Sequence, residues 1–185
     1  EEAWDVVTRT VGYTNHTILA EALETWNEDL IRKTVPRIHS IICEINRRYT
    51  ADLWNMYPGD WDKINRLSIF SHNQVKMANL SVVASHSVNG VSALHSEIIK
   101  NSIFSDFYSV YPDKFKNVTN GIAHRRWLCF SNPKLAALLD ETIGSGYRKN
   151  PVELEKFAAL KDDKNVHERL RAIKAENKLT FSKYL

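Results

Sequence analysis

The chain has 185 residues, of which 43% are hydrophobic and 25% charged, and its formal net charge is +3. This is the composition of a globular protein with a core of its own, and no run of 18 or more apolar residues is present, which argues against a membrane as a partner. The 25 basic residues are scattered among acidic neighbours, whereas a nucleic-acid surface gathers them into a stripe, so no nucleic acid is expected as a partner either.

Helical spacing of apolar residues dominates the first half of the chain. It predicts one helix over residues 18–33 and a second, opened by a proline, over 36–55. Residues 58–60, Pro-Gly-Asp, predict a turn, and residues 67–70 predict a short strand. The apolar stretch 75–85 fits either a buried helix or a strand, because the pattern alone does not separate the two.

The second half continues in the same way. Residues 91–104 predict an amphipathic helix, and 117–122 predict a short strand running into a turn. An Asn-Pro pair predicts a helix over 133–143 that ends at glycine. Pro151 begins a further helix, and 165–185 predict a last long one. The fold class expected for this chain is therefore mostly α with a few short strands.

The cysteines and the two ends of the chain indicate its setting. Cys43 and Cys129 lie in apolar contexts, which indicates buried free thiols and a cytoplasmic protein, and the first residues do not form a signal peptide. The first residues have a helical pattern, and the last ones lack a helix stop signal, which indicates a piece cut from a longer protein. Metal-ligand spacings such as His-Glu-x-x-His and Cys-x-x-Cys do not occur, and no metal site is predicted.

Three polar segments interrupt the helical pattern, at residues 13–17, 85–91 and 117–122. Each places Asn, His, Ser or Thr beside a glycine or a helix start. Glycine allows a close approach of the backbone, and these side chains offer hydrogen-bond donors and acceptors without a net charge. Such groups suit a neutral, hydroxyl-rich ligand such as a sugar, for which specificity comes from paired hydrogen bonds.

The same segments also have purely structural interpretations. Thr14, Asn15 or Thr17 could cap a helix that begins at Ile18. The Asn-Gly pairs at 89–90 and 120–121 could form turns, since both residue types tolerate positive φ. Taken one at a time, the polar segments favour these structural interpretations.

Taken together and in order, these segments resemble a known family. The strings, which keep the family's order and spacing, are YTNHTILAEALETW, PRIHSIICEINRRY, YPGDW, SHSVNGVSALHSEIIK, NVTNGIAHRRWL and ENKL. They resemble signatures of the α-glucan phosphorylases, the family of glycogen, starch and maltodextrin phosphorylase. The likeness runs nearly from end to end.

The resemblance implies a pyridoxal-phosphate-dependent glycosyltransferase of the two-lobed α/β glycosyltransferase-B (Rossmann-like) architecture. Such enzymes cleave a terminal α-1,4 linkage of a glucan with inorganic phosphate and release glucose 1-phosphate, through an oxocarbenium-like transition state. On this basis, residues 1–121 end the N-terminal lobe and 122–185 begin the C-terminal, cofactor-binding lobe, with the two parts packed as one α-rich unit. The parent enzyme is expected to be a cytoplasmic homodimer.

The resemblance also carries five residues over as substrate contacts. His16 resembles the histidine that binds the glucose 6-hydroxyl and whose backbone carbonyl lies near the anomeric carbon. Asn120 resembles the asparagine that shares this hydroxyl. Val91 resembles a residue that lines the same end of the pocket. Ala22 and Glu24 resemble residues of a side pocket beneath the anomeric carbon.

For the cofactor, the resemblance offers one residue, Trp127, as a packing contact. The family's cofactor lysine and phosphate-binding residues are expected beyond the C-terminus. The chain alone is therefore expected to bind no pyridoxal phosphate, to be catalytically inactive and to self-associate through an apolar face. The alternative is a stand-alone helical carbohydrate-binding or scaffolding module that has the polar loops without the chemistry.

Overall fold

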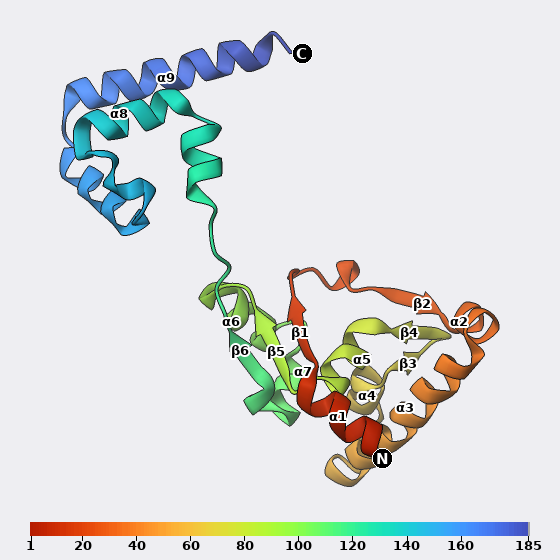
Figure 1. Ribbon diagram of the computed structural model, residues 1–185. Helices are drawn as coiled ribbons and strands as arrows, with labels where there is room; N and C mark the ends of the chain where they lie inside the picture. The colour runs from red at the N-terminus through yellow and green to blue at the C-terminus, as the bar shows by residue number, and fades with distance from the viewer. Residues whose placement is uncertain (185) are drawn as a thin grey trace. The chain divides into compact units, whose positions relative to one another are not determined.

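The computed structural model describes residues 1–184 and divides into two compact units, Glu1–Asn120 and Gly121–Leu185 (Figure 1). Both are mostly helical, with short strands in the first, which confirms the expected fold class. The assignment of residues 1–121 and 122–185 to the two lobes of a phosphorylase, and their packing as one unit, stay predictions.

A three-stranded parallel sheet organises the first unit. Its strands are β1 (Gly12–Asn15), β5 (Ser87–Gly90) and β6 (Phe115–Asn117), in the order β1-β5-β6. Asn15 pairs with Gly90, and Gly90 pairs with Asn117, so the three strands end at the same edge of the sheet. Each of these strands overlaps one of the three polar segments, and each polar segment extends beyond the end of its strand.

A smaller antiparallel sheet consists of β2 (Thr25–Asn27), β4 (Gln74–Lys76) and β3 (Phe70–Ser71). The β3–β4 hairpin turns through His72 and Asn73, which have φ of 49° and 58°. Two consecutive positive φ values are typical of the tight hairpin turn whose twist matches that of the strands it joins.

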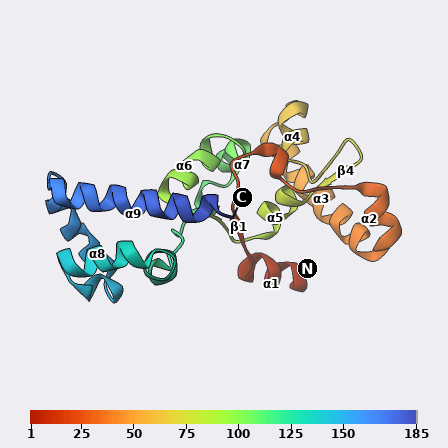
Figure 2. The same cartoon turned by 90° about the horizontal axis from the view of Figure 1, so that it is seen from above.

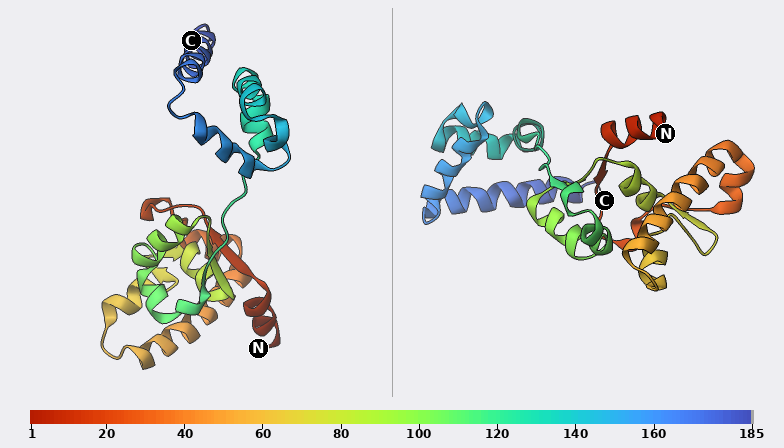
Figure 3. Two further views of the ribbon diagram at one scale, coloured as in Figure 1. Left: turned by 90° about the vertical axis from the view of Figure 1, so that its left-hand side faces the viewer. Right: turned by 90° about the horizontal axis from the view of Figure 1, so that it is seen from below.

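The helices of the first unit pack beside these sheets (Figure 3). They are α1 (Glu2–Thr10), η1 (Ala20–Ala22), α2 (Glu28–Thr34), α3 (Pro36–Met56), α4 (Trp61–Leu67), α5 (Met77–Ala84), α6 (Ala93–Asn101), α7 (Ser105–Val110) and η2 (Pro112–Lys114). The long α3 confirms the helix expected after its proline. The ambiguous apolar stretch at 75–85 is mostly the helix α5.

The single helix expected over 18–33 is wrong. This segment forms η1, the strand β2 and the short helix α2. Trp26 pairs with Val75 across the small sheet, and the Glu24 carbonyl accepts the Met77 N–H at 3.0 Å. The Asn27 side chain then accepts the N–H of Leu30 and begins α2. Pairing with a strand about 50 residues later has overridden the local helical periodicity, which is a tertiary effect.

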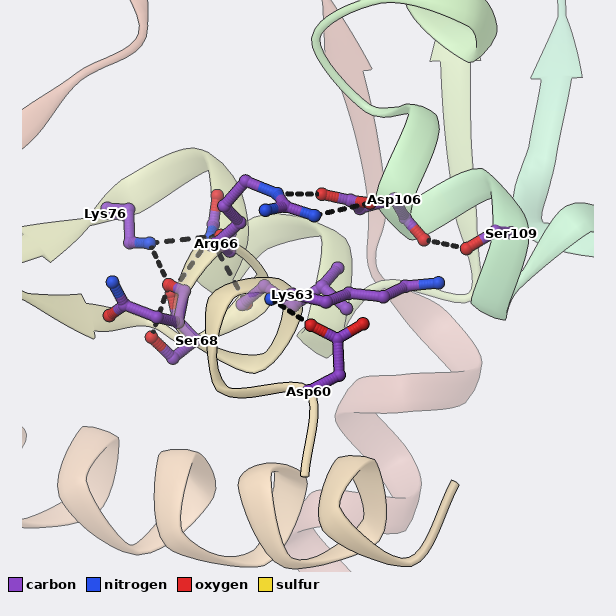
Figure 4. Close-up of polar contacts among 10 residues, drawn as sticks. Asp60, Lys63, Arg66, Ser68, Lys76, Asp106 and Ser109 are labelled. Carbon is purple, nitrogen blue, oxygen red and sulfur yellow. Dashed lines mark hydrogen bonds and ion pairs between the residues drawn. The ribbon is translucent and has the colours of Figure 1, made fainter. Parts of the chain in front are cut away.

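The core of the first unit is a cluster of buried aliphatic and aromatic residues from α3, α4, α5, α6, α7 and the parallel sheet. Its fully or almost fully buried members include Leu53, Leu67, Val82, Val88, Ile99 and Phe104. Polar contacts at its edge hold α4 in place (Figure 4). Arg66 Nε lies 2.6 Å from a carboxylate oxygen of Asp106 on α7, and Lys76 Nζ donates to the carbonyl oxygens of Asn65 and Arg66.

The second unit contains η3 (Arg125–Phe130), α8 (Pro133–Ile143), η4 (Ser145–Arg148), η5 (Pro151–Leu160) and α9 (Lys164–Ser182). The helix α9 lies beside α8 (Figure 2). The bounds expected for α8 are confirmed: Asn132 caps its start, and Gly144, with φ of 77°, ends it. The segment from Pro151 is a 3-10 helix. No helix within residues 1–184 is both long and apolar enough to cross a bilayer.

Candidate sugar-binding site

The three polar segments come together in space because their strands are neighbours in one parallel sheet. Beyond the last residues of β1, β5 and β6, the chain continues into His16, Val91 and Val118. In open sheets of parallel strands, ligands bind at the edge where the carboxyl ends of the strands meet. The structure thus places the polar segments where the fold favours a binding site.

The segment after β1 is shaped by its own side chains. Asn15 is buried, and its Oδ1 accepts the N–H of Thr17 at 3.0 Å, while its Nδ2 donates to the Tyr13 hydroxyl at 3.1 Å. The Thr17 hydroxyl in turn accepts the N–H of Leu19 at 3.1 Å. Asn15 and Thr17 thus satisfy local backbone groups, although no α-helix begins at Ile18. The side chain between them, His16, is exposed.

A cavity of about 320 Å³ opens beside this segment. Three of the five expected sugar contacts, His16, Ala22 and Glu24, line it. The remaining lining residues come from β1, from the segment after it and from α5: Tyr13, Asn15, Thr17, Leu23, Met77, Ala78 and Ser81. The volume lies at the lower end of the range of small-molecule sites, and the mixture of apolar walls with a few polar groups is typical of them.

The other two expected contacts, Val91 and Asn120, do not line this cavity but are joined to each other. The backbone carbonyl of Val91 accepts the N–H of Asn120 at 3.0 Å. The segment between β6 and Asn120 is held from β5, since Asn89 Oδ1 accepts the Val118 N–H at 2.7 Å. The Asn120 side chain is exposed.

His95 on α6 connects the two groups of expected contacts. Its Nδ1 accepts the backbone N–H of Val91 at 3.1 Å, and its Nε2 lies 3.2 Å from the carbonyl oxygen of Thr17. Because Nδ1 accepts a hydrogen bond, it carries no proton. The ring proton is therefore on Nε2, which donates a hydrogen bond to the Thr17 carbonyl oxygen. Sequence patterns did not reveal this role, because the Thr17 carbonyl lies 78 positions away in the chain. The signal present was the placement of His95 in the first turn of the helix that follows Val91.

Gly90 serves a close approach of β5 to α6, and not a turn. A Cβ atom at this position would lie 2.2 Å from Ser96 Oγ and 2.7 Å from Ser96 Cα. Neither Gly90 nor Gly121 has a positive φ. The expectation that the Asn-Gly pairs form positive-φ turns is therefore wrong. At residue 90, the glycine makes room for a helix backbone.

The carboxylate of Glu24 accepts a hydrogen bond from the Trp26 indole Nε1. The backbone carbonyl of the same residue pairs with α5, as described above. Glu24 is thereby positioned from two sides at the wall of the cavity. Its role beneath an anomeric carbon stays a prediction.

Trp127, the expected cofactor contact, lies in η3 of the second unit with 66% of its surface exposed. Its indole offers a packing surface, but one packing residue is not a cofactor site. The described thiols, Cys43 and Cys129, are free and half-buried, whereas full burial was expected.

Comparison with known proteins decides the family. The family model for carbohydrate phosphorylase matches residues 1–185. The chain belongs to the carbohydrate phosphorylase family. It is 51% identical to glycogen phosphorylase of Chlamydia trachomatis over 179 residues, 95% of this chain and 22% of that protein.

Further relatives agree across bacteria and mammals. Glycogen phosphorylase of Bacillus subtilis is 48% identical over 161 residues, which is 85% of this chain and 20% of that protein. The muscle form from Bos taurus is 46% identical over 188 residues, which is 100% of this chain and 22% of that protein. The chain thus spans about a fifth of the length of the curated phosphorylases it matches. The family expected from the sequence strings is confirmed.

Proposed function

We propose that this chain forms the glucosyl-binding part of an α-1,4-glucan phosphorylase. The whole enzyme would cleave the terminal α-1,4-linked glucose of a glucan with inorganic phosphate and release glucose 1-phosphate. The observation that carries the proposal is the cavity at the carboxyl end of β1, because it gathers His16, Ala22 and Glu24 at one place.

The chemistry of the residues fits a neutral sugar. His16 would hydrogen-bond the 6-hydroxyl of the glucosyl unit through its ring, and Asn120 would share that hydroxyl. The backbone carbonyl of His16 would lie near the anomeric carbon, where positive charge develops in an oxocarbenium-like transition state. A carbonyl dipole that is fixed before the reaction stabilises such charge without reorganising.

The hydrogen bonds of His95 support this assignment. A residue that ties the segment of His16 to the segment of Val91 and Asn120 would keep the two hydroxyl-binding side chains at a constant separation. Pre-oriented groups contribute to rate, because a misplacement of about 1 Å at a reacting centre can cost on the order of a hundredfold.

The whole enzyme would use pyridoxal phosphate, which would supply a phosphate group for proton transfer. Within this chain, Trp127 would contribute packing to the cofactor. A cytoplasmic location and a homodimeric parent belong to the same proposal. So does the self-association of the isolated chain through its exposed apolar residues, which include Trp61, Leu94, Ile122, Trp127 and Phe130.

The experiment is phosphorolysis by the full-length protein that carries this chain. With maltoheptaose and inorganic phosphate, we expect glucose 1-phosphate, whereas the 185-residue chain alone should form none. Binding of the glucan by the full-length protein without any glucose 1-phosphate would support the alternative, a carbohydrate-binding or scaffolding module. Phosphorolysis by the isolated chain would contradict the proposal that this chain forms only the glucosyl-binding part of the enzyme.

A further inference from the structure

A cluster of three potential metal ligands lies in the first unit, apart from the residues that line the cavity. Glu28 is the first residue of α2, and His39 and Cys43 are one turn apart on α3. A separation of four residues places two side chains on the same face of a helix, and α2 packs against α3. All three residues are half-buried.

The distances within the cluster are close to those of a tetrahedral zinc site. His39 Nε2 lies 3.0 Å from Glu28 Oε1 and 3.6 Å from Cys43 Sγ. Zinc binds nitrogen and oxygen at about 2.0–2.2 Å and sulfur at about 2.3 Å, so two of its tetrahedral ligand atoms lie roughly 3.3–3.6 Å apart. All three ligand atoms already lie within 4.8 Å of one another, so small rotamer changes would complete the geometry.

We propose that Glu28, His39 and Cys43 form a binding site for a divalent transition-metal ion, with zinc as the preferred ion and a water as its fourth ligand. A mixed thiolate, imidazole and carboxylate set suits zinc, whereas magnesium and calcium require oxygen ligands. On binding, a Zn–S bond replaces the S–H bond of Cys43, and the proton passes to the solvent. The ion would tie α2 to α3 and steady the segment that leads from Glu24 to Glu28.

The competing interpretation is a hydrogen-bonded pair of His39 and Glu28 with a thiol packed beside it. The His39 ring also lies edge-on to Phe70, with ring centroids 5.8 Å apart, which positions the imidazole without any ion. This interpretation predicts that zinc has no specific effect. The sequence patterns did not reveal the cluster, because Glu28 comes from a segment expected to continue a longer helix.

The test uses the 185-residue chain, stripped of metal with a chelator, and zinc or magnesium as the only addition. Zinc at about a hundredfold excess over its dissociation constant should raise the thermal midpoint by about 5 °C or more, with one ion per chain, and magnesium should not. Cobalt in place of zinc should give a thiolate-to-cobalt charge-transfer band. Cys43→Ser should abolish the band and weaken zinc binding by at least about tenfold.

Cys129→Ser is the matched control, because Cys129 is also a half-buried free thiol but lies in the second unit. It should leave both the band and the affinity unchanged. If Cys43→Ser fails to fold by circular dichroism, Glu28→Gln serves instead, since it retains a hydrogen-bonding group and removes the carboxylate. The proposal would be overturned if zinc did not raise the thermal midpoint of the wild-type chain. It would also be overturned if the variant that folds bound zinc as tightly as the wild type. Neither outcome depends on phosphorylase activity.

Discussion

The Nε2 atom of His95 lies 3.2 Å from the backbone carbonyl oxygen of Thr17, although 78 positions separate the two residues in the chain. The opposite ring nitrogen accepts the N–H of Val91. One neutral imidazole therefore connects the segment that carries His16 to the segment that carries Val91. The chain folds so that these two segments lie on adjacent strands, β1 and β5.

The two hydrogen bonds of the His95 ring predict that substitutions at this position lower the kcat of the full-length phosphorylase by different amounts. His95→Ala removes both hydrogen bonds and should lower kcat by roughly ten- to hundredfold, because the two segments lose their fixed separation. His95→Asn retains an acceptor near the position of Nδ1 and should recover part of the rate. The KM for long glucans should change little, because the proposed contacts hold only one glucosyl unit. Steady-state kinetics of the two variants test this prediction. A wild-type kcat in His95→Ala would contradict it.

Gly90→Ala should destabilise the first unit. The new Cβ would approach the Ser96 backbone to 2.7 Å, so β5 and α6 would have to separate. Overpacking of this kind typically costs about 1–3 kcal/mol. Gly121→Ala is the control, because nothing lies within 4 Å of a Cβ at that position. Urea denaturation of both variants measures the difference, and equal stability would mean that the contact of Gly90 with Ser96 is not tight.

The sequence predicted elements that depend on local interactions better than elements that depend on partners far away in the chain. The helix α8 was predicted from its Asn132 cap to its Gly144 stop, because caps and stops are local signals. The segment at 18–33 was mispredicted, because its strand β2 exists only through pairing with β4, about 50 residues later. Periodicity within a window carries no information on such a partner.

The candidate site shows the same limit. His16 and Asn120 were found through strings that resemble a family, and their polar surroundings already suggested a sugar. His95 was missed, because its role depends on the Thr17 carbonyl, which only the parallel pairing of β1 with β5 brings near. The sequence predicted the chemistry of each polar segment, but it did not predict the hydrogen bonds of His95 that connect the segments.

Tyr49→Phe should stabilise the chain. The Tyr49 hydroxyl is buried and has no hydrogen-bond partner among the described residues, and burial raises the pKa of this phenol. Removing an unsatisfied buried hydroxyl should increase the free energy of unfolding by about 1 kcal/mol. Tyr147→Phe is the contrast, since the Tyr147 hydroxyl donates to the Ala136 carbonyl, and its loss should destabilise. A loss of stability in Tyr49→Phe would reveal a partner for that hydroxyl.

The contacts of Glu44 predict a low pKa for its carboxyl group. Hydrogen bonds from Arg47 and then Arg48 lower the pKa of this carboxyl from 4.5 to about 2. Because the folded-state pKa lies below the ordinary value, any stability contributed by Glu44 is present above about pH 4.5 and is lost as the pH falls toward 2. An NMR titration of the Glu44 side chain should show this low midpoint, and Arg47→Gln should raise it. A wild-type midpoint near 4.5 would mean that the two arginines do not hold the carboxylate in solution.

The central claim is that His16 and Asn120 hold the 6-hydroxyl of the glucosyl unit being cleaved. The most direct measurement is the rate of phosphorolysis by the full-length protein, for wild type and Asn120→Ala, with a normal glucan and with one whose terminal unit is 6-deoxyglucose. With the normal substrate, Asn120→Ala should lower kcat by about ten- to hundredfold, because a hydrogen bond lost in a dry site costs roughly 1–3 kcal/mol, and His16→Ala should lower it further. With the 6-deoxy substrate, wild type and Asn120→Ala should react at similar rates. An equally large defect of Asn120→Ala with the 6-deoxy substrate would contradict the claim and make Asn120 a structural residue of the segment after β6.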